Sequence, residues 1–331
     1  MKILNFGIAE LHLPLKVNWK LSRNETTEKV NLILCLEYQG RHFFGEVAFN
    51  VRYGETFKNS FDQFHLFSRK LEKQSLSEGL LLLKEADINN SLKCGFEQCL
   101  LKAICLEQRI SVHEFFSLAK PEPISTFFTI PIMPLEQIPL YYKNNNLDRY
   151  KGIKLKVNRT DAYNLIKKTC SNLGPSQQLL VDANEAFESG QELIDLMMTV
   201  KDMPILCFEQ PFPKELHEEN LKVTEKKIFP LMADESIEDI AHFDHLKSGF
   251  DYINVKTMKT GGLVRAVEII KEAKEHNLKV MMGCMIETSL SMSYSWEISS
   301  LVDIFDFDGP LLLKKDPYEF MIPEYLDLES F

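Results

Sequence analysis

The second half of the chain repeats a simple pattern, in which a short apolar run is followed by a longer stretch with helical periodicity. The apolar runs are Phe127–Ile132, Gly152–Val157, Leu179–Val181, Ile205–Phe208, Phe229–Met232, Tyr252–Val255, Lys279–Met282 and Ile304–Phe307. The stretches between them include Asp161–Ser171, Gly190–Val200 and Gly262–His276. Strands that alternate with helices predict a parallel sheet, and a TIM-type barrel is favoured over an open doubly wound sheet.

Residues 1–118 have a different pattern, typical of an α+β unit. Strand-like runs cover Ile3–Leu11, Val30–Tyr38 and His42–Phe49, with a turn at Gln39-Gly40-Arg41 before the last of them. The polar stretch from Lys16 to Lys29 is expected to be a loop, and helical periodicity covers Phe57–Lys73 and Leu92–Glu107. We therefore divide the chain into an α+β domain (1–118), a barrel domain (119–313) and a short C-terminal segment (314–331).

The composition argues against several classes of function. The 331 residues are 45% hydrophobic and carry a formal net charge of -10 without a Lys/Arg block, so no nucleic-acid or membrane partner is expected. No apolar run approaches the roughly 20 residues that a membrane-spanning helix needs, and no signal-peptide pattern is expected at the start. The seven cysteines form no CxxC pair, which is typical of free thiols and predicts a cytoplasmic protein.

Two lysines lie two residues apart in the run Gly152–Val157. In a strand, Lys154 and Lys156 project from the same face. Two buried cations are costly unless an anion meets them, and the alternative is a solvated pair on an edge strand. If the face is buried, desolvation and mutual repulsion lower the pKa of these lysines, so that one can act as a neutral base near pH 7.

Acidic residues end three successive strands of the predicted barrel, where the chemistry of such barrels takes place. They are Asp182, Glu209 and Asp234. One acidic strand end alone would be interpreted as a helix cap, but three converging carboxylates repel one another unless a cation neutralises them. Ligands that are all oxygen favour Mg²⁺ first and Mn²⁺ second.

A third lysine, Lys256, ends the sixth strand, which lies opposite the second strand in a ring of eight. Lys156 and Lys256 would therefore face each other across the barrel mouth. A substrate carboxylate at the metal would place its α-carbon between them, where the metal stabilises the enediolate and a lysine removes the α-proton. Two bases on opposite faces indicate racemisation or epimerisation, whereas a single working base would leave β-elimination open.

Asp306 and Asp308 project inward from the last strand and are separate from the three metal ligands. Paired carboxylates would bind a cationic group of the substrate, most simply an ammonium. Alternatively, one pairs with a barrel lysine and the other caps a turn. A molecule with a carboxylate at the metal and an ammonium at this pair is amino-acid-like, and the long separation favours a dipeptide.

The motifs around these residues resemble those of one known family. In chain order they are KLKVN, VDANEAF, FEQP, ADES, NVKTMKTGG, GCMIETSLS and FDFDGPLLLK. They resemble the enolase superfamily, muconate lactonising enzyme subgroup, and within it the dipeptide epimerases of the L-Ala-D/L-Glu type. The resemblance is close over the barrel and loose elsewhere. It implies a TIM-like (β/α)7β barrel with an N-terminal α+β capping domain whose loops choose the substrate side chain.

The resemblance also implies a role for each site residue. Asp182, Glu209 and Asp234 would bind Mg²⁺, Lys156 and Lys256 would be the acid/base catalysts, and Asp306 and Asp308 would bind the α-ammonium of the dipeptide. Lys154 would support the bound carboxylate, and Arg23 would hold an acidic side chain. The stretch around Arg23 is one residue shorter than the family pattern, and the C-terminal tail is shorter than usual.

The predicted function is therefore that of an isomerase, a Mg²⁺-dependent dipeptide epimerase that inverts the C-terminal residue of a small-molecule dipeptide. An N-acylamino acid racemase or o-succinylbenzoate synthase on the same scaffold is the alternative, since those substrates lack a free ammonium. A non-catalytic carboxylate-binding protein is a more remote one. Barrels of this group often associate, so a homo-oligomer is a further expectation.

Overall fold

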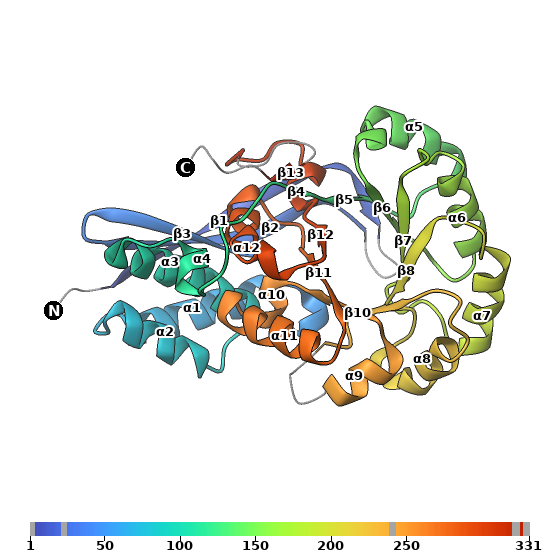
Figure 1. The fold of residues 1–331 in the computed structure, drawn as a ribbon. Helices are drawn as coiled ribbons and strands as arrows, with labels where there is room; N and C mark the ends of the chain where they lie inside the picture. Colours follow the sequence, from blue (N-terminus) through green and yellow to red (C-terminus); the bar gives the residue numbers. More distant parts are fainter. Residues whose placement is uncertain (1–3, 21–24, 238–242, 320–324, 327–331) are drawn as a thin grey trace.

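The computed structural model describes residues 4–20, 25–237, 243–319 and 325–326. In these ranges the chain forms a three-stranded sheet, an eight-stranded sheet and a short two-stranded one. Figure 1 shows the first of these as the long blue hairpin, beside a ring of strands surrounded by helices. Arg23 lies outside the described residues, so its predicted role stays a prediction.

The N-terminal sheet is antiparallel and consists of β1 (Asn5–Lys20), β2 (Glu25–Tyr38) and β3 (Arg41–Val47). The predicted turn before β3 is confirmed: Gln39 and Gly40 both have positive φ, as a tight hairpin turn requires. The loop predicted from Lys16 to Lys29 is wrong where the chain is described. Strands β1 and β2 continue through it because their outer ends pair with each other, with Lys20 opposite Glu25.

Four helices follow: α1 (Phe57–Leu71), α2 (Leu76–Lys84), α3 (Asn90–Gln108) and α4 (Val112–Phe115). The sequence interpretation missed α2, although Ser75 and Glu78 form a capping box at its start. Helix α3 packs closely on β3, where two glycines allow the backbones to approach. A Cβ on Gly45 would lie only 2.0 Å from the carbonyl oxygen of Gly95. Leu34, Phe64 and Phe96 are among the side chains buried between this sheet and its helices.

The eight-stranded sheet is parallel and confirms the predicted barrel. Its strands are β5 (Phe127–Ile130), β6 (Gly152–Lys156), β7 (Gln178–Asp182), β8 (Ile205–Glu209), β9 (Leu231–Ala233), β10 (Tyr252–Val255), β11 (Lys279–Gly283) and β12 (Ile304–Asp306), each hydrogen-bonded to the next. The helices of the barrel are α5 (Ile138–Asn144), α6 (Ala162–Cys170), α7 (Gly190–Thr199), α8 (His217–Thr224), α9 (Phe243–Gly249), α10 (Thr257–Thr260), α11 (Leu263–Glu275) and α12 (Ser289–Trp296).

Side chains join the two ends of this strand order and so close the ring. The amide of Phe307, just after β12, donates to Oγ1 of Thr126 at 2.7 Å. The amide of Thr129 in β5 donates to Oδ2 of Asp308 at 2.6 Å. The strand order, the helical connections between the strands and this closure make a (β/α)7β barrel.

The interior of the barrel has an apolar layer and a charged layer, because side chains two apart on a strand share a face. The apolar layer contains Phe127, Leu180, Cys207, Met232, Tyr252 and Met281. Two residues further along their strands, Leu180 is followed by Asp182 and Cys207 by Glu209. The charged layer therefore lies at the carboxyl ends of the strands, above a buried apolar floor.

The N-terminal unit covers the same end of the barrel. The Asn31 side chain donates to the carbonyl of Ile286 at 2.9 Å, and Oε2 of Glu46 accepts from the hydroxyl of Thr288 at 2.6 Å. A separate antiparallel pair joins β13 (Tyr325–Leu326) to β4 (Ile124–Ser125), which precedes the barrel. The domain boundaries at residues 118 and 313 stay predictions. None of the helices in the described ranges has the length and apolar character needed to cross a membrane.

Candidate active site

The charged layer brings together eight of the nine residues that the sequence singled out, all of them buried. They are Lys154, Lys156, Asp182, Glu209, Asp234, Lys256, Asp306 and Asp308. Seven of them lie at or just beyond the carboxyl end of a strand, and Lys154 lies two residues before the end of β6. The ninth residue, Arg23, is outside the described ranges. Convergence was expected from the barrel topology; of the pairings among these side chains, only that of one aspartate of the last strand with a barrel lysine was considered.

Lys154 stands at the centre of the cluster. Its ammonium nitrogen lies 2.9 Å from Oε2 of Glu209, 3.0 Å from Oδ2 of Asp306 and 3.3 Å from Oδ2 of Asp182. The solvated edge-strand alternative for this lysine is therefore wrong, because its side chain is 4% exposed and surrounded by carboxylates.

Lys156 and Lys256 stand at the two flanks of the acidic residues. The ammonium nitrogen of Lys156 lies 2.8 Å from Oδ2 of Asp182, and that of Lys256 lies 2.8 Å from Oδ2 of Asp234. Strands β7, β8 and β9 separate β6 from β10, so three carboxylate-bearing strands lie between the two lysines. Lys156 also donates to Oδ1 of Asn184 at 2.8 Å.

The electrostatics of the lysines differ from the sequence prediction. Burial lowers the pKa of Lys154, but Asp306, Glu209 and Asp182 outweigh burial and raise it well above its usual value. Lys256 behaves alike: burial lowers its pKa, but the charges of Asp234 and the other anions around it, Glu209 among them, together raise it above its usual value. The predicted lowering is therefore wrong for Lys154, because the carboxylates around it stabilise its charge more than burial destabilises it.

The three predicted metal ligands differ in the direction of their pKa shifts. Burial alone would raise the pKa of Asp182 and Asp234, but the adjacent lysines reverse this and lower both. Burial raises the pKa of Glu209 to about 7; Lys154 opposes the rise, while Asp182 and Asp234 add to it. Glu209 also accepts a hydrogen bond of 2.7 Å from the Asn254 side chain.

A hard divalent cation fits the donor chemistry of Asp182, Glu209 and Asp234, which supply only oxygen ligands. Among the described residues, no three His, Cys, Asp or Glu side chains are arranged to bind one ion. The carboxylates of Asp182, Glu209 and Asp234 pair with lysines instead. The repulsion that raises the pKa of Glu209 is what a bound cation would relieve. Nearby, Oε2 of Glu235 is buried without a hydrogen-bond partner among the described residues.

Asp306 and Asp308 make contacts similar to those of the alternative interpretation, in which one aspartate pairs with a barrel lysine. Asp306 pairs with Lys154, a barrel lysine, and Asp308 accepts the backbone amide of Thr129. One oxygen of Asp306, Oδ1, is buried and has no hydrogen-bond partner within the described part of the chain. Burial and the charge of Asp306 raise the pKa of Asp308 to about 7. The predicted ammonium-binding role stays a prediction.

Lys259 is a site residue that sequence reasoning did not single out. Its ammonium nitrogen donates to the carbonyl of Asp234 at 2.6 Å and also pairs with Oδ1 of the same residue. Lys256 and Lys259 are three residues apart, one before α10 and one within it, so both reach the same carboxylate. The three-residue spacing from Lys256 was the sequence signal that could have identified Lys259.

The N-terminal unit contributes one further contact at the barrel mouth. The guanidinium of Arg52 pairs with Oε1 of Glu185 at 2.5 Å, and Glu185 follows β7 with a positive φ. Burial raises the pKa of the neighbouring Tyr53. The charge of Asp234 raises it further, and that of Lys256 lowers it. The short segment Val51–Tyr53 therefore lies close to the charged layer.

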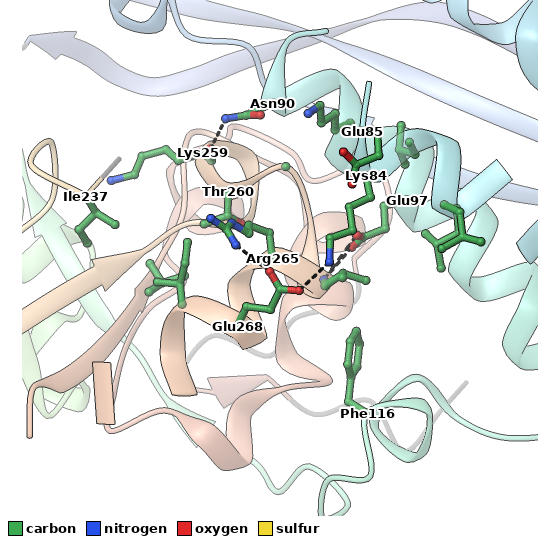
Figure 2. A pocket seen from close by; sticks show the side chains of 18 of the residues that line it. Lys84, Glu85, Asn90, Glu97, Phe116, Ile237, Lys259, Thr260, Arg265 and Glu268 are labelled. Atoms are coloured by element: carbon green, nitrogen blue, oxygen red, sulfur yellow. Dashed lines mark hydrogen bonds and ion pairs between the residues drawn. The ribbon is translucent and has the colours of Figure 1, made fainter. Parts of the chain in front are cut away.

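A cavity of about 550 Å³ lies between the N-terminal unit and the barrel, outside the charged layer (Figure 2). Its lining includes Lys84 and Glu97 from the N-terminal helices and Arg265 and Glu268 from α11. Lys259 borders it as well, but none of the eight residues of the charged layer does. The cavity therefore borders the candidate active site at Lys259 but is not lined by the charged layer itself.

Comparisons with known proteins agree with this geometry. The family described as Enolase C-terminal domain-like matches residues 143–318, more than half of the chain. The chain belongs to this family. The superfamily expected from the motifs is thus confirmed, and the match covers β6 to β12 together with the charged layer.

Two relatives and one solved structure are similar to the chain. It is 27% identical to the L-Ala-D/L-Glu epimerase of Bacteroides thetaiotaomicron, over 86% of this chain and 74% of that protein. It is 32% identical to the N-acetyl-D-glutamate racemase of a Pseudoalteromonas species, over 50% of this chain and 51% of that one. The solved dipeptide epimerase of Enterococcus faecalis, complexed with Mg and L-Leu-L-Tyr, has the same fold, with a TM-score of 0.88, 20% identity and coverage of 96% and 93%.

Proposed function

We propose that the chain is a divalent-metal-dependent dipeptide epimerase that inverts the α-carbon of the C-terminal residue. The observation that carries the proposal is the position of Lys156 and Lys256, which flank the three carboxylate-bearing strands from opposite sides. An α-carbon held between two such groups can lose its proton to one and gain a proton from the other.

The two lysines would take opposite roles in each direction of the reaction. The neutral form of one removes the α-proton, and the ammonium of the other returns a proton to the opposite face. The carboxylates of Asp182 and Asp234 lie 2.8 Å from the side-chain nitrogens of Lys156 and Lys256, respectively. A group that neutralises these carboxylates would remove the interaction that keeps Lys256 protonated, and would bring it closer to the base that the reaction requires.

Asp182, Glu209 and Asp234 would hold the metal, with Mg²⁺ as the first choice because all three donors are oxygens. When bound, the ion supplies the charge that stabilises the enediolate form of the substrate carboxylate. Lys154, at the centre of the cluster, would support the same carboxylate from the protein side, since its ammonium already lies among anions. Lys259 would keep the Asp234 carboxylate in place.

Asp306 and Asp308 would bind the α-ammonium of the dipeptide, and the unpartnered Oδ1 of Asp306 supports this assignment. The Bacteroides relative acts on a dipeptide, and the Enterococcus structure holds one. The Pseudoalteromonas relative is a racemase of an N-acetylated amino acid, which keeps an N-acylamino acid racemase as the second candidate. The Asp pair separates the two, because an acylated nitrogen carries no charge to bind.

The proposal is tested by proton NMR in D₂O with Mg²⁺ and pools of L,L-dipeptides. We expect the α-proton signal of the C-terminal residue to disappear as the L,D diastereomer forms. Exchange with retained configuration would contradict two-base chemistry, and the absence of exchange in every pool would contradict the dipeptide assignment. N-acylamino acids, run in parallel, give the same readout for the second candidate.

The cellular compartment is a separate proposal, supported by the cysteines. All seven are free thiols in the structure, and four of them are buried. Free thiols are usual where the environment is reducing, so we propose a cytoplasmic location. Alkylation of the thiols in freshly prepared extracts of the source cells, followed by mass spectrometry, would show whether they are reduced there.

A further inference from the structure

The segment that carries Lys256 closes into a compact loop between β10 and α11. The carbonyl of Lys256 accepts hydrogen bonds from the amides of Lys259 and Thr260, at 2.9 and 3.0 Å. The carbonyl of Thr257 accepts the amide of Gly262 at 3.0 Å. These bonds connect the two ends of the loop, so the backbone of Lys256 and the start of α11 belong to one hydrogen-bonded unit.

A carboxylate from the N-terminal unit holds that far end. Oε1 of Glu97, on α3, accepts the amide of Leu263, and it accepts the amide of Val264 at 3.3 Å. The hydroxyl of Tyr294, on α12, donates to the same oxygen at 2.6 Å. Glu97 is 4% exposed, so a single buried side chain joins α3, α11 and α12.

The fit at this junction is tight. Gly262 has a φ of 127°, and a Cβ on it would lie 2.2 Å from Oε1 of Glu97. A second contact from α3 reaches the middle of the loop, where the Asn90 side chain donates to the carbonyl of Lys259 at 2.7 Å. Figure 2 shows Asn90 and Glu97 on α3 beside Lys259 and Thr260 of the loop.

The same loop is held on its inner side by the active site. Lys259 donates to the carbonyl of Asp234, and Lys256 pairs with the carboxylate of that residue. The loop is therefore fixed between Asp234 inside the barrel and α3 outside it. Lys156 lies apart from this loop, because it ends β6 and contacts Asp182 and Asn184.

We propose that Glu97 is a positioning residue for Lys256: by holding the amide of Leu263, it sets where the Lys256 ammonium stands in the barrel mouth. The inference rests on the proposed function and extends it, since it gives the N-terminal unit a part in the chemistry of one lysine. An ordinary helix cap would stabilise α11 and would leave the reaction unaffected. If Glu97 positions Lys256, its loss should slow proton exchange only on the face of the substrate that Lys256 deprotonates.

The experiment measures α-proton exchange in D₂O separately from the L,L- and L,D-dipeptides, with Mg²⁺-loaded protein. Variants Lys156→Ala and Lys256→Ala first establish which epimer each lysine deprotonates. Glu97→Ala should then slow exchange of the epimer assigned to Lys256 about tenfold or more, since small displacements of a reacting group cost that much. Exchange of the other epimer should stay within about twofold of wild type.

Two further variants separate positioning from general damage. Burial raises the pKa of Glu97 to about 7, so its neutral form is accessible, and Glu97→Gln should restore most of the exchange. Lys84→Met removes a different contact between the N-terminal helices and α11, the 2.9 Å pair with Glu268, and should leave both epimers unchanged. If circular dichroism shows that Glu97→Ala is unfolded, Glu97→Asp, one methylene shorter, takes its place with the same expectation.

Equal slowing of both epimers by the folded Glu97 variant, or no slowing of either, would overturn the inference. A one-sided effect of the same size in Lys84→Met would overturn it as well. A wild-type protein without any exchange would overturn the proposed function itself, and the inference with it. That outcome is recognised before any variant is made.

Discussion

The ammonium nitrogen of Lys154 lies 2.9 Å from Oε2 of Glu209, and the two side chains are 4% and 0% exposed. Two other carboxylates, those of Asp182 and Asp306, lie within 3.3 Å of the same nitrogen. One cation therefore compensates several buried anions at the centre of the barrel. Removal of that cation should be costly, because a buried charge without a partner is far more destabilising than a buried ion pair.

The Lys154→Met variant should lose about 3 to 5 kcal/mol of unfolding free energy in the absence of metal. Urea denaturation followed by circular dichroism measures this loss. Addition of Mg²⁺ should recover part of it, because the ion takes over the compensation of the carboxylates. Lys151→Met, at an exposed position just before β6, is the matched control and should change stability by less than about 0.5 kcal/mol. Equal stability of the two variants would contradict the central role of Lys154.

Asp306→Asn should distinguish the two candidate substrates. Loss of the carboxylate removes the partner of a dipeptide ammonium, so kcat/KM for dipeptides should fall by about 10²-fold or more. Turnover of N-acylamino acids should change far less, because their nitrogen is neutral. Steady-state kinetics on both substrate classes measures the ratio. A parallel fall for both classes would mean that Asp306 acts through Lys154, with which it pairs at 3.0 Å, rather than on the substrate.

Glu46 should make stability depend on pH. Burial is the main cause that raises its pKa to about 8, the charge of Glu287 adds to it, and hydrogen bonds from Thr288 and Asn31 oppose it. The folded protein therefore holds this proton more tightly than the unfolded chain. Its stabilising contribution is complete below the unfolded pKa of about 4.3 and is lost as the pH rises toward 8.

The size of the effect follows from the same shift. Between pH 5 and pH 8 the wild type should lose about 4 kcal/mol relative to Glu46→Gln, at 1.36 kcal/mol for each unit of pKa. Urea unfolding of both proteins at the two pH values measures the difference, and contributions from groups that do not interact with Glu46 cancel. Parallel pH profiles would show that Glu46 is ionised in the folded protein.

Metal binding should be visible without any turnover. Mg²⁺ at 100 times its Kd should stabilise the protein by about 2.7 kcal/mol, because the unfolded chain lacks the site. Differential scanning calorimetry with Mg²⁺ and with EDTA measures the shift in Tm. Asp234→Asn should abolish most of the shift, whereas Asp251→Asn, outside the charged layer, should preserve it. A shift of the same size in both variants would place the ion elsewhere.

The barrel was predictable because its signal is local and repeated. Each strand is a short apolar run, each helix has its own periodicity, and the alternation of the two favours one topology. Most of the site residues were predictable for the same reason, since they lie where an apolar run ends, whereas Lys259, in the loop after β10, was missed. The loop predicted between Lys16 and Lys29 was wrong because polar residues can form strands when a partner strand supplies the hydrogen bonds, as Lys20 and Glu25 do.

The sequence by itself determined the alternation of strands and helices, the acidic and basic residues at the strand ends, and the family to which the chain belongs. Only the tertiary structure decided how these charges pair: Lys154 with three carboxylates, Lys156 with Asp182 and Lys256 with Asp234. It also brought Glu97, from a helix far away in the chain, against the loop of Lys256. Periodicity reports which face a residue occupies, whereas pairing depends on distances between elements that are remote in sequence.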